Sequence, residues 1–542
     1  MRPHSGSTEN DVQAIQLNIG DYAIIFGYFA LIVVIGLRLR RRMVSSSEYF
    51  QAGRSLPAIV TGIAFVAANC GALEIMGIVS TSAKYGARAN QFYWIGAIPA
   101  MLFLGLFMMP IYYGSRTRSV PEFLKLRYNE STRVLNAVSF AIMMVLVSGI
   151  SLYAMAIIMR SFLGWSFGSS AIVAGVFVLI YVVLGGLTAT IYNEVLQFVL
   201  IVLGLAPMVF FVLRDFQGIA GLRAALPPDL SHTWKGLNIA QPFGSAMDVV
   251  GIVFGLGFVL SCGYWCTDFL LVQRALAARD VTAASQTPLI GAVAKLFFPA
   301  LVVIPGLAAI ILIPKGLAER YDLALPTLMS RYYGHGLLGL GVVAMLSSFM
   351  SGMAGNITAF NTVWTYDLYQ SYIARDRSDR HYITVGRVAT VVATILSIGT
   401  AFIVLRFNSL MDYVQLLFSF FNAPLFATFL LGMFTKWATP SGGFWGLLLG
   451  TLASVLHHAL YSARILPYGS DMSANFYGAM VGWSICFVVT TVVSMVTTKK
   501  PAAELAGLVY VKRERAAGGQ NVLWASAAAI LAVCIALNWW LW

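Results

Sequence analysis

Charged residues and cysteines are both scarce in this sequence. Asp, Glu, Lys and Arg make up 11% of its 542 residues, against 59% hydrophobic residues, and the mean hydropathy is +0.79. Soluble domains carry about 25% charged residues, so this composition excludes a soluble domain and predicts an all-α integral membrane protein. The polar connections are also too short to bury a core of their own.

The five cysteines all fall within apolar segments, which excludes a disulfide framework. Cys262 and Cys266 are about one helical turn apart, but no histidine cluster accompanies them, and buried thiols usually act as small apolar side chains. The sequence also lacks a Ser–His–Asp set, a metal-ligand cluster and a phosphate-binding loop. We therefore expect that the protein is not an enzyme.

Basic residues outnumber acidic residues, 35 to 22, which gives a net charge of +13. In a membrane protein, Lys and Arg accumulate in cytoplasmic loops and attract anionic lipids. Most basic residues here fall in alternate loops, so we predict a multi-pass protein of the cell membrane with both termini extracellular or periplasmic. The lipid bilayer accounts for the charge without a nucleic acid, and nothing in the sequence requires an obligate protein partner.

Apolar runs of about 20 residues, the length that crosses a bilayer core, recur along the chain. We predict about fourteen transmembrane helices, over residues 19–38, 57–82, 91–113, 134–160, 170–185, 191–213, 246–273, 285–314, 335–370, 385–405, 409–434, 441–460, 475–498 and 521–541.

Two of these runs contain residues that would interrupt a membrane helix. Asn69, Gly71 and Glu74 lie in the second run, and Ser261–Asp268 lies in the seventh. An ionisable side chain at bilayer depth marks a functional site by default, and interrupted helices expose backbone groups that bind solutes and ions. The five-helix separation of the two runs predicts two five-helix repeats. Packing of small residues between helices is the alternative explanation.

This pattern divides the chain into five regions, in which each repeat opens with its interrupted helix. They are an N-terminal extension with the first helix and a cytoplasmic linker (1–56), a first repeat (57–213), an extracellular loop (214–245), a second repeat (246–434) and C-terminal peripheral helices (435–542).

Further polar residues stand inside apolar runs. Ser348 and Ser351 share a helix face in the ninth run, and their hydroxyls suit sodium, which prefers oxygen ligands as other hard cations do. Hydrogen bonding between helices is the alternative. Glu194, Lys295 and Gln415 are also isolated in apolar surroundings. Lys295 must face a partner or an aqueous cavity unless it extends to the membrane surface.

Several short motifs match a known family. They are Glu48–Arg54, Ala67–Asn69, Ser119–Phe123 with Arg127–Tyr128, Gly185–Leu187, and Tyr264–Asp268 with Gln273–Arg274. From about residue 48 to about residue 436, the chain resembles the sodium/solute symporter family, which includes the sodium/glucose cotransporters. The resemblance implies an inverted five-plus-five helix repeat, the LeuT-like fold, and alternating access.

The resemblance also implies a sodium site between the second and ninth helices. Its ligands would be the backbone carbonyls of Ala67, Cys70 and Ser348 and the hydroxyl of Ser351. Gly352 stands where the family usually has a second hydroxyl, so one oxygen ligand is missing.

Glu194 matches a carboxylate that lies near this ion in sugar-transporting relatives, which implies a role in coupling. Sodium is the expected coupling ion. Because a ligand is lost at Gly352, protons carried by Glu74 or Glu194 are the alternative driver.

The solute site implied by the resemblance has aromatic walls with a carboxylate, an ammonium and an amide. This set suits a sugar or polyol, and it also suits an amino acid or organic acid, with Lys295 taking the carboxylate. A carboxylate is unusual at Glu74, so glucose or galactose itself is not implied. The matching positions are Glu74, Phe92, Tyr93, Tyr264, Trp265, Lys295, Met411 and Gln415.

Together these features predict a secondary active transporter that couples a cation, expected to be sodium, to symport of a small polar organic solute. The cation would favour the solute-competent state. A solute sensor on the same fold is the alternative, and it would need a separate signalling partner because the tail after Thr498 offers only one further apolar run.

Overall fold

The computed structural model describes residues 17–40, 46–313, 321–405, 409–511 and 519–542. Within these ranges the chain is helical, and its one β-bridge joins Leu56 and Ala278. Residues 1–16 and 41–45 of the predicted N-terminal region lie outside the described residues.

The α-helices are α1 (Ile19–Arg40), α2 (Ser46–Gln51), α3 (Ala58–Asn69), α4 (Ile78–Tyr85), α5 (Ile98–Phe103), α6 (Met109–Gly114), α7 (Val120–Arg127), α8 (Glu130–Leu163), α9 (Phe167–Asp215), α10 (Ile219–Ala225), α11 (Cys262–Thr267), α12 (Phe269–Leu276), α13 (Val281–Leu312), α14 (Ala324–Tyr332), α15 (Leu337–Thr362), α16 (Asp379–Val404), α17 (Leu410–Phe434), α18 (Pro440–Ser462), α19 (Asp471–Val496) and α20 (Gly519–Trp540). Shorter π- and 3-10-helical segments are η1 (Ala52–Arg54), η2 (Leu73–Gly77), η3 (Gly86–Asn90), η4 (Phe92–Ala97), η5 (Leu104–Met108), η6 (Gly251–Ser261), η8 (Tyr321–Leu323) and η9 (Val363–Ile373).

Ten helical segments of the described chain are long and apolar enough to cross a membrane. Two further pairs of helical segments, each bent at a short break, are together long and apolar enough to cross a membrane: Ala58–Asn69 with Leu73–Asn90, and Gly251–Thr267 with Phe269–Leu276. Shorter apolar helices, Ile19–Ile35 and Phe167–Ile180, lie at the first and fifth predicted runs. The multi-pass helical architecture is confirmed, whereas the count of fourteen and the inverted repeat stay predictions.

The fifth and sixth predicted runs are joined in α9 across a kink at Gly186. Its backbone has φ 54° and ψ −155°, a conformation that favours glycine. A Cβ atom at this position would lie 2.7 Å from the carbonyl oxygen of Tyr49. Glycine therefore lets the chain turn sharply against the segment that follows α1.

Short polar side chains begin several of the long helices. Asn129 begins α8, Asp280 begins α13, Ser409 begins α17 and Ser470 begins α19, each accepting a hydrogen bond from a backbone amide of the first turn. Such caps satisfy amides that have no partner inside the helix. They place the helix starts within a few residues of the predicted runs.

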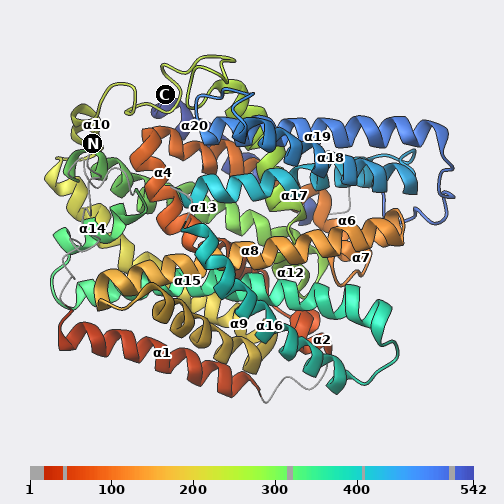
Figure 1. The fold of residues 1–542 in the computed structure, drawn as a ribbon, viewed down its shortest axis with the longest axis horizontal. Helices are drawn as coiled ribbons and strands as arrows, with labels where there is room; N and C mark the ends of the chain where they lie inside the picture. The colour runs from red at the N-terminus through yellow and green to blue at the C-terminus, as the bar shows by residue number, and fades with distance from the viewer. Residues whose placement is uncertain (1–16, 41–45, 314–320, 406–408, 512–518) are drawn as a thin grey trace, which may run out of the picture.

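The helices pack around α15, in which every residue from Gly341 to Thr362 is buried. In Figure 1, α18 and α19 lie against each other on one side of the molecule, and α1, α9 and α16 lie on the opposite side. Helices α8 and α9 pack directly on α15. The predicted ninth membrane helix is thus the centre of the bundle.

Both predicted interruptions are present. Helix α3 ends at Asn69, and the chain bends by 59° before it continues at Leu73. The second bend, of 48°, separates α11 from α12 at Asp268, the last residue of the predicted window Ser261–Asp268. The earlier residues of that window stay helical.

Candidate functional site

The first interruption and α11, which directly precedes the second interruption, border a cavity. Its wall also includes residues of η4, α13 and α17. All eight predicted solute residues line it: Glu74, Phe92, Tyr93, Tyr264, Trp265, Lys295, Met411 and Gln415. Their role in binding stays a prediction, but the structure brings them together from five parts of the chain.

An ion pair forms part of the wall of this cavity. The Nζ atom of Lys295 is 2.8 Å from Oε1 of Glu74, and it also donates a hydrogen bond to the side-chain oxygen of Asn69. The Lys295 side chain is fully buried and its ammonium lies 5.4 Å from the ring centroid of Tyr93. Lys295 therefore faces partners rather than the membrane surface, as a buried cation must.

Aromatic rings and unpartnered polar atoms form the rest of the wall. The ring of Tyr264 stacks on Phe418 with centroids 4.7 Å apart, and its hydroxyl accepts a hydrogen bond from Asn69. The buried Tyr93 hydroxyl and Gln415 Oε1 have no hydrogen-bond partner among the described residues. Buried polar groups are costly to leave unpaired, so these atoms are suited to bind solute hydroxyls.

The predicted sodium ligands also meet. The Ser351 hydroxyl donates to the carbonyl oxygen of Ala67 at 2.9 Å, and the Ser348 hydroxyl donates to that of Cys70 at 2.6 Å. All four residues are fully buried. Hydroxyl and carbonyl oxygens of this kind suit a hard cation, so the end of α3 and the facing turn of α15 could hold one.

The backbones of Gly352 and Gly71 are in close contact, which leaves little room for a side chain at position 352. A Cβ atom on Gly352 would lie 3.0 Å from the Cα atom of Gly71 and 3.4 Å from Oγ of Ser151. Distances this short between a Cβ atom and a neighbouring atom are uncommon in proteins. The hydroxyl that the family usually places here is thus replaced by direct packing between the interruption and α15.

Glu194 forms an ion pair with Arg274 and does not line the solute cavity. The carboxylate on α9 lies 2.6 Å and 3.3 Å from two guanidinium nitrogens of Arg274 on α12, and both side chains are fully buried. This bidentate pair links α9 to the helix that follows the second interruption. Any proton-carrying role for Glu194 would require the pair to separate.

Asn69 and Phe418 also line the cavity, although neither was predicted to bind solute. Asn69 was predicted only as part of the first interruption, but it contacts both Lys295 and Tyr264. Phe418 carried a usable signal, because Met411, Gln415 and Phe418 are spaced by four and three residues and share one helix face. Periodicity from Gln415 could have found Phe418.

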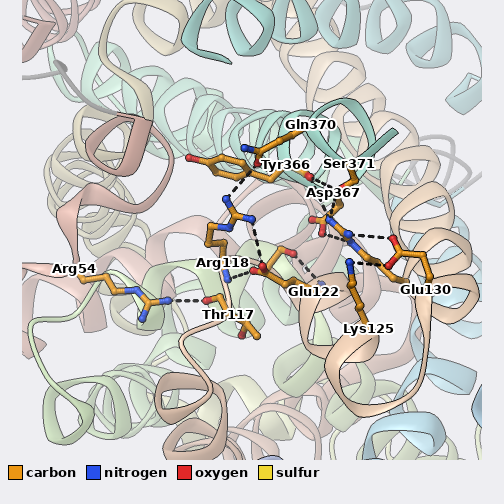
Figure 2. A network of polar contacts seen from close by, with 12 residues as sticks. Arg54, Thr117, Arg118, Glu122, Lys125, Glu130, Tyr366, Asp367, Gln370 and Ser371 are labelled. Atoms are coloured by element: carbon orange, nitrogen blue, oxygen red, sulfur yellow. Dashed lines mark hydrogen bonds and ion pairs between the residues drawn. The ribbon is translucent and has the colours of Figure 1, made fainter. Parts of the chain in front are cut away.

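A polar network connects the segments around α7 and the start of α8 with η9 (Figure 2). Arg133 at the start of α8 binds Asp367 of η9 at 2.9 Å, and both side chains are buried. Arg118 binds Glu122 and Gln370, and its guanidinium lies over the ring of Tyr366. Salt bridges and stacking thus join the α6–α7 connection and the start of α8 to η9.

Comparisons with known proteins identify the family and the fold. The model of the sodium:solute symporter family matches residues 49–450. The chain is 26% identical to sodium/glucose cotransporter 4 of Mus musculus over 92% of this chain and 79% of the relative. It is 27% identical to the sodium/glucose cotransporter of Vibrio parahaemolyticus over 81% of this chain and 84% of the relative.

The sodium/myo-inositol cotransporter 2 of Oryctolagus cuniculus is 26% identical over 90% of this chain and 78% of the relative. The solved structure of a Na+-coupled sialic acid symporter superposes with a TM-score of 0.77, at 19% identity, over 89% of this chain and 99% of that one. A nucleobase-cation-symport-1 family transporter superposes with a TM-score of 0.52 at 12% identity over 85% of this chain and 97% of that one. These structural likenesses show a shared fold.

Proposed function

This chain belongs to the sodium:solute symporter family, and we propose that it couples sodium entry to the uptake of a neutral polyhydroxylated solute, a sugar or a polyol. The family and the relatives are transporters rather than enzymes. The proposal therefore concerns the solute and the residues that bind it.

The observation that carries this proposal is the ion pair between Glu74 and Lys295. Because the two charges compensate each other, the cavity does not favour a solute of either sign. The Tyr93 hydroxyl can donate a hydrogen bond to a solute hydroxyl or accept one from it, and the Gln415 oxygen can accept one. The aromatic rings suit the apolar faces of a sugar. The relatives named for glucose and myo-inositol agree with this class.

A zwitterion is the second candidate, and the same ion pair favours it. If this ion pair separated, Glu74 could bind the amine of an amino acid and Lys295 its carboxylate. Two ion pairs with the solute would then replace the one between Glu74 and Lys295. An organic acid would use Lys295 alone. Both would leave the hydroxyl-binding groups of the wall poorly matched.

For the cycle we propose alternating access by two repeats, residues 57–213 and 246–434, with both termini outside. Sodium at the carbonyls of Ala67, Cys70 and Ser348 and the hydroxyl of Ser351 would hold α3 against α15 in the solute-binding state. Such coupling requires a difference in binding free energy of typically about 1–3 kcal/mol. Glu194 would act on this site through its pair with Arg274.

The test is uptake by the purified chain in lipid vesicles. Labelled sugars, polyols, amino acids and organic acids are supplied with an inward sodium gradient and, separately, a proton gradient. We expect sodium-driven accumulation of a sugar or polyol. Accumulation of an amino acid would support the second candidate, proton-driven accumulation would move coupling to Glu74 or Glu194, and equilibration alone would contradict symport.

Replacing the central cation should abolish uptake. Lys295→Ala leaves Glu74 buried without its partner and Asn69 without its donor, so we expect loss of transport with normal membrane insertion. Lys436→Ala, which removes an exposed lysine, is the matched control. Near-normal uptake by Lys295→Ala would remove this residue from the solute site.

A further inference from the structure

An apolar groove lies on the outside of the bundle, and its lining residues differ from those of the solute cavity. Its walls are α8 and α16, and its floor is the end of α15 with η9. All of these belong to segments long and apolar enough to cross a membrane. The lining side chains Ile142, Val388 and Leu396 are 51%, 58% and 51% exposed. An exposed apolar surface of this kind marks contact with lipid or with another apolar partner.

The groove is closed where α8 and α16 meet. A Cβ atom at Gly149 would overlap the Thr400 side chain, and the Thr400 hydroxyl donates a hydrogen bond to the Val145 carbonyl at 3.2 Å. From Thr384 to Leu396 the groove follows α16 for twelve residues, which is about 18 Å of helix. This length is similar to the hydrocarbon of one membrane leaflet, about 15 Å.

The opposite end of the groove is polar. Tyr369 of η9 and His381 of α16 line it, with the Tyr369 hydroxyl 3.1 Å from Nε2 of His381. Thr384, one turn further along α16, also lines the groove. Tyrosine is enriched where a membrane protein passes from hydrocarbon to water. The groove therefore runs from an apolar, closed end to a polar, open end.

Three arginines surround the open end. Arg380 precedes Thr384 by four residues on α16, so it continues the groove face beyond the last lining turn. Arg375 and Arg377 lie in the connection that joins η9 to α16 at the same end, and all three side chains are exposed. Asp376 and Asp379 lie among them, which leaves a surplus of one positive charge. Basic pockets between membrane helices bind acidic lipid headgroups.

We propose that this groove binds an anionic phospholipid, with an acyl chain between α8 and α16 and the headgroup at Arg380 and the arginines of the η9–α16 connection. In the proposed orientation this lipid belongs to the cytoplasmic leaflet. Because η9 forms the floor and is joined to α8 by the pair of Arg133 and Asp367, the lipid would support η9 between α8 and α16. The inference goes beyond the proposed function and does not depend on it.

The test is tryptophan fluorescence of the purified full chain in vesicles of phosphatidylcholine and phosphatidylglycerol at equal mole fractions. Either lipid carries brominated acyl chains, which quench a tryptophan that they contact. Trp364 lines the groove and is 38% exposed, whereas Trp445 on α18 is 47% exposed and lies outside it. Subtracting the signals of Trp364→Phe and Trp445→Phe from that of the wild-type chain gives the contribution of each tryptophan.

We expect brominated phosphatidylglycerol to quench Trp364 about fivefold more effectively than brominated phosphatidylcholine, the preference typical of one net basic charge near a membrane surface. Trp445 should be quenched equally by both lipids. Raising the salt concentration should weaken the preference at Trp364, because salt screens the headgroup from the arginines.

Arg380→Gln should bring quenching of Trp364 by the two lipids close to equal. Lys436→Gln is the matched control, because it removes one exposed basic residue from the connection between α17 and α18. Val388→Phe tests the apolar part of the groove and should lower the same preference by filling it. Its control is Val488→Phe on α19, where the side chain is 54% exposed and lies outside the groove.

Equal quenching of Trp364 by both lipids in the wild-type chain would overturn the inference, since the groove would then contact lipid without selecting it. Absence of quenching by either lipid would also overturn it and would indicate that protein, such as a second copy of this chain, covers the groove. Equal losses in Arg380→Gln and Lys436→Gln would contradict the headgroup site. These measurements use neither sodium nor solute, so failure of the proposed function would appear separately in the uptake experiment.

Discussion

Lys84 on α4 and Arg133 on α8 each close one end of the bundle, but they do so at different depths. The Lys84 ammonium lies 3.1 Å from Asp412 of α17, and the two side chains are 27% and 9% exposed. The Arg133 guanidinium lies 2.9 Å from Asp367, and the two side chains are 4% and 1% exposed. We call these the outer pair and the inner network, following the proposed orientation.

The difference lies in what surrounds each pair. The Arg133 guanidinium also binds the Tyr366 carbonyl and Ser371, so three of its contacts reach η9 (Figure 2). The outer pair is a single ion pair between α4 and α17. It is partly exposed to water, which screens the attraction between its charges. The comparison predicts that the end held by Arg133 is the harder one to open and, in the proposed orientation, that solute access from outside requires less rearrangement.

The largest effect should come from the inner network. Arg133→Ala leaves Asp367 buried without its partner, and breaking such a pair typically costs about 3–5 kcal/mol. We expect a matching loss in the free energy of unfolding, measured by thermal unfolding in detergent, together with impaired uptake. Adding Asp367→Asn should restore part of the stability. If Arg133→Ala lowered the free energy of unfolding no more than Lys84→Met does, the proposed difference between the two ends would be wrong.

The next effect concerns pH at the outer end. Burial raises the pKa of Asp322, which interacts with Asp412 and Lys84, to about 6. The folded state therefore keeps a proton that the unfolded state loses near its ordinary pKa of 3.8, so stability should fall as pH rises through this range, by up to about 3 kcal/mol. Asp322→Asn should flatten the dependence and stabilise the protein at pH values above 7. An unchanged slope of melting temperature against pH would contradict this assignment.

The outer pair itself should be worth less. Lys84→Met keeps most of the side-chain length but removes the charge, and partial exposure limits the expected cost to about 1 kcal/mol. Such a change alters a two-state population about fivefold, so the outer end should open more often. Labelling of Ile78→Cys, which lines the solute cavity, by an impermeant thiol reagent should accelerate accordingly. Slower labelling would show that the pair does not close the outer end.

The smallest effect is expected at the exposed edge of the inner network. Lys125 and Glu130 lie 2.8 Å apart, but their side chains are 47% and 41% exposed. Lys125→Gln should change stability by less than about 1 kcal/mol and leave uptake unchanged. A large effect here would show that membership of the network, rather than burial, sets the contribution of each pair.

Local sequence features account for much of the fold. Hydrophobic length predicts the spans, and Asn69 with Gly71 predicts the first interruption where it occurs. The second was placed over Ser261–Asp268 but falls at Asp268 alone, because the preceding residues continue as helix and the Asp268 side chain caps α12. The Asp268 side chain can cap α12 only where the chain bends, and hydropathy alone does not show the position of that bend.

The candidate site divides in the same way. Family resemblance gave the eight cavity residues, but no periodicity could show that Lys295 pairs with Glu74, which lies more than 200 residues earlier in the chain. The partner of Glu194 was also not predictable, because Arg274 belongs to another helix. Such pairs arise from packing between distant helices, which local patterns of polar and apolar residues do not specify.

The contact between Gly71 and Gly352 has a mechanical consequence. Interdigitated side chains must separate before one helix can rotate against another. Gly71 and Gly352 have no side chains, so only backbone atoms meet at this contact. Rotation of α15 against the interruption of α3 would therefore meet little steric friction. The position that lacks an oxygen for the ion is well placed to serve as a pivot.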